Sequence, residues 1–196
     1  TAAFHPAQIA KINSLYECSL PFGQAAPQRR GRKLRVGRPI NKLPFIVQGP
    51  WMLDFDRSSR SGLGRIENSS LTGANPPSLR RMDLWKKAGI TVAGRPDWLF
   101  VKLHTHGMDP TQMDTVLREP MQNFLGELIN GAPDRKEILH FVTAREMANI
   151  IVAACDGREG NPGDYRDYRY KLGRARTQRE AGATSEAAAH GLGVRG

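Results

Sequence analysis

Residues 98–104 form a mostly apolar run of strand length, WLFVKLH, and the chain then continues Thr105-His106-Gly107. So apolar a run favours burial, and in α/β proteins ligands and catalytic groups gather just beyond the carboxyl ends of parallel strands. If this segment is extended, alternation places His104 and His106 on one face and Thr105 on the other. These two histidines are therefore the first candidate functional residues.

Two imidazoles on one face have more than one interpretation. They can bind a single metal ion together, or one can bind the metal while the other exchanges protons near neutral pH. The structural alternative is that one histidine caps a loop through a hydrogen bond while the other is solvated. Residue pattern alone leaves these alternatives open.

The remaining chain alternates between short apolar runs and amphipathic helices. Residues 45–48 and 138–142 are typical of buried strands, and a third run, residues 51–56, alternates apolar and acidic side chains. Helical spacing and capping signals predict helices over 75–88, over 109–130 with a break at the internal proline, and over 143–156, the last with a Thr/Glu capping box. This order predicts an α/β fold with parallel strands.

Two further groups of polar residues are candidates for binding. Asp54 and Asp56 share one face if residues 51–56 are extended, and such a pair can hold a hard cation, although a solvated edge explains it too. Residues 65–68 and 71–75, which include Arg65, Glu67, Asn68 and Asn75, are expected to lie in a loop that lines a polar pocket for a hydroxylated ligand.

Composition narrows the partner classes. The net charge of +10 favours an anionic partner, so a basic nucleic-acid-binding domain has to be considered. The basic clusters in residues 29–38 and 174–195 lack interleaved aromatic side chains, and no zinc-finger or RNA-binding motif occurs, which argues against nucleic acid. No apolar run reaches the roughly 20 residues of a transmembrane helix. Cys18 and Cys155 fit no metal-binding spacing, and Cys155 is expected to be a buried thiol.

Residues 1–172 are expected to form one structural unit. From residue 173 onward the chain is rich in Ala, Gly, Arg and Glu and has almost no large apolar side chain. Such a segment cannot bury enough apolar surface to offset the entropy of ordering. Residues 173–196 are therefore predicted to be a disordered basic tail.

Five phrases resemble the carboxyl-terminal half of polysaccharide-deacetylase-like proteins, members of the carbohydrate esterase superfamily found in bacterial exopolysaccharide gene clusters. The phrases are FIVQGPWMLDF (45–55), GRIENSSLTGANPP (64–77), RPDWLFVKLHTHG (95–107), LHFVTAREMAN (139–149) and GNPGDYRDYRYKL (160–172). The resemblance covers about residues 4–172. It implies a distorted (β/α) barrel with parallel strands and metal-dependent hydrolysis of acetyl groups on a polysaccharide or oligosaccharide.

The resemblance also implies roles for particular residues. A late strand ending in Leu-x-His supplies the catalytic acid in this superfamily, so His104 or His106 takes that role, while Arg65, Glu67, Asn68 and Asn75 orient an acetylated carbohydrate. The implied cofactor is a divalent metal, zinc among the candidates. The usual metal motif, an acidic pair followed by His-x-x-x-His, does not occur in these 196 residues. We therefore expect an incomplete barrel from a fragment of a longer hydrolase.

Two other functions and the compartment stay open. The first alternative is a non-catalytic carbohydrate-binding or assembly protein of the same fold, and the second is the basic nucleic-acid-binding domain. The resemblance implies a bacterial protein, either cytoplasmic or periplasmic. The oligomeric state is not indicated.

Overall fold

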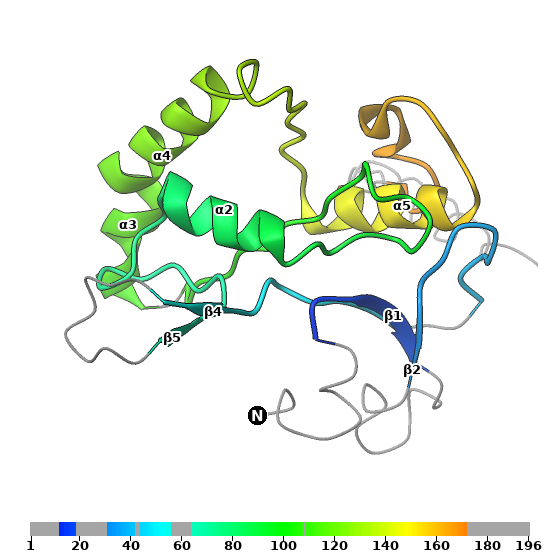
Figure 1. Ribbon diagram of the computed structural model, residues 1–196, viewed down its shortest axis with the longest axis horizontal. Coiled ribbons are helices and arrows are strands. Elements are labelled where there is room, and N and C mark those ends of the chain that lie inside the picture. The colour runs from blue at the N-terminus through cyan, green and yellow to red at the C-terminus, as the bar shows by residue number, and fades with distance from the viewer. Residues whose placement is uncertain (1–11, 19–30, 42–43, 56–63, 108, 172–196) are drawn as a thin grey trace, which may run out of the picture.

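A computed structural model describes residues 12–18, 31–41, 44–55, 64–107 and 109–171 (Figure 1). A three-stranded antiparallel sheet opens the described part, in the order β2-β1-β3. Its strands are β1 (Leu15–Cys18), β2 (Gly31–Lys33) and β3 (Phe45–Val47). The central strand is buried along its whole length. Gly31 fits against it because a Cβ there would lie 2.5 Å from the carbonyl oxygen of Glu17.

A two-stranded antiparallel hairpin follows. It consists of β4 (Met52–Asp54) and β5 (Arg65–Glu67), with Leu53 opposite Ile66. Alternation sends Asp54 and Glu67 into the protein, where both are buried, and leaves Leu53 and Ile66 exposed. The hairpin thus turns its charged face inward, toward helix α2.

The ends of the helices coincide with capping residues and prolines in the sequence. They are α2 (Leu79–Lys87), α3 (Met113–Leu117), α4 (Glu119–Asn130) and α5 (Ala144–Cys155), with 3-10 turns η3 (Pro110–Gln112) and η4 (Pro162–Tyr165). The predicted capping box of α5 is confirmed, because the side chains of Thr143 and Glu146 each accept from the backbone amide of the other. The predicted interruption near Pro120 is also confirmed, since α3 ends just before α4 begins. Ser78, rather than Asn75, caps α2.

Two apolar clusters form the core. One joins α5 to the three-stranded sheet and to residues such as Ile90 and Trp98, and the other joins α2 to α4 through Trp85 and Phe124. Trp85 and Phe124 meet edge to face at 6.2 Å between ring centroids. Figure 1 shows the same division, with α2, α3 and α4 around the hairpin and α5 beside β1. None of the described helices combines the length and apolar character needed to cross a membrane.

Asn149 attaches the last described segment to α5. Its buried side-chain amide donates to the carbonyl oxygens of Arg166 and Tyr170, at 2.7 and 2.9 Å. Its carbonyl accepts from the amides of Arg169 and Tyr170, at 2.9 and 2.6 Å. One side chain therefore uses its full hydrogen-bonding capacity on residues 166–170.

The predicted parallel-strand barrel is wrong for this structure. Both described sheets are antiparallel, and neither closes. Residues 98–104 and 138–142 belong to no strand, and the only parallel pairings among the described residues are isolated bridges, Arg35 with Ala93 and Ser70 with His104. An apolar run indicates burial, whereas a strand also needs a neighbour whose backbone is in register. Residues 173–196, predicted to be a disordered tail, lie outside the described residues.

Candidate functional site

Hydrogen bonds join the polar loop after β5 to the segment that carries the histidines. Leu71 donates its amide to the carbonyl of His104 at 2.8 Å, and His104 donates its amide to the carbonyl of Ser69 at 3.3 Å. The hydroxyls of Ser69 and Thr105 reinforce this contact, each donating to the other segment at 3.0 Å, to the carbonyls of Lys102 and Leu71 respectively. Two regions that the sequence marked separately are therefore brought side by side.

A fully buried ion pair lies beneath this junction. The guanidinium of Arg81 donates from Nε and Nη2 to the two carboxylate oxygens of Glu67, each at 2.8 Å. Trp85 donates its indole N–H to the same carboxylate at 2.9 Å, and Ser69 donates its amide at 2.8 Å. Burial alone would raise the pKa of Glu67, but these hydrogen bonds outweigh it and lower the pKa. Glu67, predicted to orient a sugar, is thus an ionised and internally satisfied carboxylate.

His104 and His106 are both exposed next to this ion pair. Partial desolvation of the imidazole, followed by the charge of Lys102 and the proximity of His106, lowers the pKa of His104 below its ordinary value, although Glu67 opposes the shift. The uncharged form of His104 is therefore favoured more than in a free imidazole. A neutral imidazole can accept a proton from water and pass it on.

The other predicted sugar-binding residues differ in their availability. The exposed Asn68 accepts from the amide of Ser70 through Oδ1, at 3.1 Å, and lies in the loop beside His104. Asn75 contributes its backbone, which accepts from Arg81 and donates to the carbonyl of Thr72. Arg65 is half-exposed and donates to Asp54 at 3.0 Å. Asn68 is thus the predicted sugar-binding residue that keeps an exposed side chain in the loop paired with His104.

The candidate cation site at Asp54 is occupied by arginines. Arg65 and Arg80 both pair with this buried carboxylate, and the Arg80 hydrogen bond is the main cause of its lowered pKa. Asp56 lies outside the described residues. Among the residues that the structure describes, no three His, Cys, Asp or Glu side chains are grouped so that they could hold a metal ion. The described side chains therefore do not fit a complete metal site.

Several residues of this region had no clear functional signal in the sequence. Arg81 lies four residues before Trp85 and so on the same face of α2, which is a detectable sign that a charge is buried there. Gln112 is less accessible to prediction, because it accepts from the amide of Gly73 at 2.9 Å across 39 residues. Its own amide group donates to Asp109 at 3.1 Å, which anchors the turn after the histidines to the loop.

Comparison with known proteins does not extend these observations, since no family model, curated protein or solved structure matches the chain.

Proposed function

We propose that this chain takes part in hydrolysing acetyl groups on a polysaccharide or oligosaccharide, with His104 and His106 as the residues that transfer protons. The observation that carries the proposal is the junction of residues 68–71 with residues 102–105, which puts the exposed imidazole of His104 beside the loop that holds the exposed side-chain amide of Asn68. Such groups suit a hydroxylated substrate. The resemblance to polysaccharide-deacetylase-like proteins supports the same reaction.

In this proposal His104 acts first as a base and then as an acid. It accepts a proton from the water that attacks the acetyl carbonyl, so that a new C–O bond forms. It then returns the proton to the departing amine or alkoxide as the acetyl bond breaks, releasing acetate. Glu67 does not act as the base, because its oxygens already accept from Arg81, Trp85 and Ser69.

The divalent metal ion, zinc included, stays a prediction from the resemblance. Such an ion, when bound, polarises an acetyl carbonyl and activates water. The two exposed imidazoles are the described side chains that could contribute to holding it, and the remaining ligands are not identified.

The test measures acetate released from N-acetylated chitooligosaccharides and from acetylated xylan by the full chain, with and without added Zn²⁺. The double variant His104→Gln with His106→Gln should lower the rate by about a hundredfold or more, the usual contribution of general acid–base catalysis. His140→Gln, a third imidazole outside this site, is the matched control and should keep the rate. Unchanged turnover in the double variant, or no acetate release by the unmodified chain, would contradict the proposal.

A non-catalytic carbohydrate-binding role is the second candidate. It is favoured by the observation that the buried carboxylates Asp54 and Glu67 are both engaged by arginines, which leaves neither one free for catalysis. Calorimetric titration with the same oligosaccharides separates the two functions. Binding that Asn68→Ala weakens, without any acetate release, identifies the non-catalytic role.

A further inference from the structure

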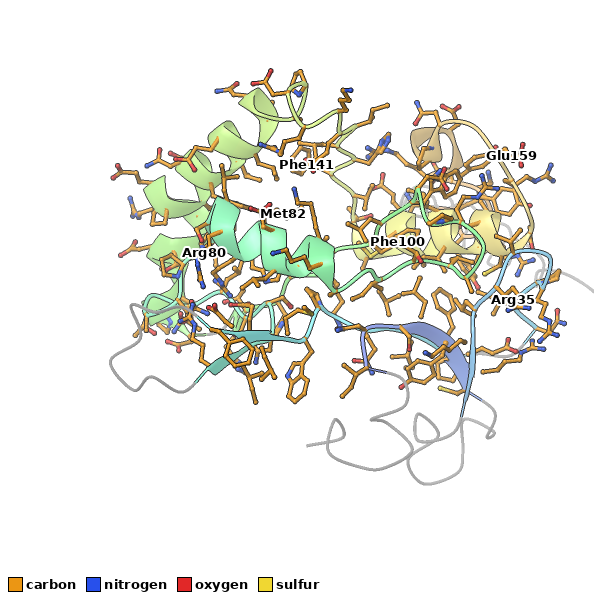
Figure 2. All side chains as sticks on the ribbon, in the orientation of Figure 1. Arg35, Arg80, Met82, Phe100, Phe141 and Glu159 are labelled. Carbon is orange, nitrogen blue, oxygen red and sulfur yellow. The ribbon has the colours of Figure 1, made fainter. Side chains whose placement is uncertain are left out.

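An apolar crevice of about 790 Å³ lies between α2, α4, α5 and two segments that belong to no helix or strand, residues 97–103 and 136–142. Figure 2 labels Met82, Phe100 and Phe141, which line it from α2 and from the two segments. Large apolar side chains at its edge are open to solvent, with Ile138 exposed by 84% and Phe141 by 51%. Such exposure in a concave site marks a binding surface.

The first wall of the crevice has the hydrogen-bonding pattern of an open strand edge. Phe100 donates its amide to the carbonyl of Ile90 at 2.9 Å, and the carbonyl of Lys102 accepts from Ser69 at 3.0 Å. In an extended chain, successive residues present their backbone groups to opposite sides. The alternate residues Leu99, Val101 and Leu103 therefore face the other side, and within the described residues their amides and carbonyls bond to no other backbone group.

The second wall is more open still. Among the described residues, no backbone hydrogen bond involves any residue from 138 to 142, although the segment, ILHFV, is mostly apolar. Unpaired amides and carbonyls beside apolar side chains are costly unless they find a partner. Unpaired strand edges are templates for another strand.

Charge decides against an ionic ligand. Lys86 lines the crevice but pairs with Glu137 at 2.7 Å, and Glu137 also accepts from Arg135 at 2.9 Å. Lys136 and Asp97, which also line it, have opposite charges. The walls thus carry little net charge, so they are complementary to an uncharged occupant. The net charge of +10 opposes pairing with a second copy of this chain.

We propose that an extended, uncharged segment of a different polypeptide, apolar at alternate positions, docks in this crevice by pairing its backbone with the open edges of residues 99–103 and 138–142. The recognition is strand addition, in which backbone hydrogen bonds supply affinity and alternate side chains fill the apolar walls. The crevice segment 97–103 shares residues 102 and 103 with the junction at the histidines, but strand addition there uses neither histidine side chain and does not rest on the proposed hydrolysis.

The experiment uses the full chain and the capped peptide acetyl-TVTVTVT-amide as the probe. Amide hydrogen exchange should slow by at least about tenfold at residues 99, 101 and 103 and at alternate residues of 138–142 when the peptide binds. The matched peptide carries N-methyl groups on its three valines, which removes the donors along one edge but keeps the side chains. It should bind at least about tenfold more weakly.

A pair of variants tests the same edge from the protein side. Val101→Pro removes an amide that has no backbone partner in the described structure, whereas Val101→Ala keeps the amide and trims the side chain. With both folds verified by circular dichroism, Val101→Pro should weaken peptide binding about tenfold more than Val101→Ala does. Because neither substitution touches the histidines, both variants should leave acetate release unchanged.

Four results would overturn the inference. The first is that the unmethylated peptide does not bind, and the second is that the methylated peptide binds equally well. The third is that the same amides are already protected in the isolated chain because the two segments pair with each other. The fourth is that their protection accompanies dimer formation. The second result assigns the crevice to a small apolar ligand, and the last assigns it to a second copy.

Discussion

Removing Arg81 should destabilise the protein more than any surface substitution, because it leaves Glu67 as a buried carboxylate without its cation. Arg81 is 2% exposed and Glu67 is 0% exposed, so solvent cannot replace the lost contacts. In Arg81→Met the carboxylate keeps the hydrogen bonds of Trp85 and Ser69 but loses both bonds from the guanidinium. Breaking a buried ion pair in this way costs about 3–5 kcal/mol of unfolding free energy.

The carbonyl oxygens that Arg81 also satisfies add to this cost. Those of Ser70 and Pro76 each accept from it at 2.8 Å, and the carbonyl of Asn75 accepts as well. Ser70 and Asn75 are only partly buried and Pro76 is exposed, so water can replace much of what these carbonyls lose, and their share of the cost is small. The cost of breaking the ion pair is by itself a large part of the whole stability of a domain, about 5–15 kcal/mol, so Arg81→Met is expected to unfold at much lower urea concentration or not to fold.

Urea unfolding of a double-mutant cycle measures the pair. Glu67→Gln keeps the size of the side chain while removing its charge, and the double variant, Glu67→Gln with Arg81→Met, removes both charges. The double variant should be less destabilised than the sum of the two single variants, by about 0.5–3 kcal/mol of coupling. A loss below about 1 kcal/mol in Arg81→Met, or strict additivity, would refute the argument.

If Arg81→Met does not fold, the pH dependence of the unfolding free energy of Glu67→Gln still tests the contribution of the buried carboxylate. Because the pKa of Glu67 is lowered in the folded state, its contribution is present above the ordinary glutamate pKa and is lost as the pH falls through the folded value. Glu67→Gln should flatten that acid limb.

The remaining predictions concern single side chains. Burial, followed by the charges of Asp156 and Glu17, raises the pKa of Cys155 to about 12. Iodoacetamide at pH 8 should therefore leave this thiol unmodified in the native protein and alkylate it in urea, as measured by mass spectrometry. Alkylation of Cys155 in the native protein would contradict this prediction. Thr143→Ala should cost about 1 kcal/mol of unfolding free energy by removing the cap of α5, with Thr143→Ser as the control that keeps it. Lys102→Met should raise the pKa of His104, because it removes a nearby positive charge, and an unchanged NMR titration of the His104 ring proton would exclude that cause.

The sequence predictions were accurate where the interacting residues lie close together in the sequence, and they failed where the partners lie far apart. The capping box of α5 depends on residues three positions apart, so it could be identified without any knowledge of the fold. The strand expected at 98–104 depended on neighbours that the sequence does not specify, and in the structure only single residues there find backbone partners. Apolar character was predictable in both cases, whereas pairing was predictable only where it is local.

The candidate site shows the same limit. His104 could be singled out because it ends an apolar run, and the loop containing Asn68 because it is polar. Their contact through Ser69 and Leu71 spans more than thirty residues and appeared only in the structure. Glu67 was expected to face a ligand, but it lies opposite α2, where its carboxylate forms an ion pair with Arg81. Whether an acidic side chain binds a ligand or an internal partner depends on what the fold places against it.

The attachment of residues 166–170 to α5 depends on one atom of Asn149 in a way that contact area does not show. Replacing Asn149 by Asp would put an oxygen where the amide nitrogen donates to the carbonyl oxygens of Arg166 and Tyr170. The change adds one atomic mass unit and removes no contact area, but it turns two attractions into repulsions. Arg145 would still donate to the same two carbonyls, so the segment would loosen from α5 rather than separate from it. The exchange of a single atom would thus first appear as greater protease sensitivity near the carboxyl end of the described chain.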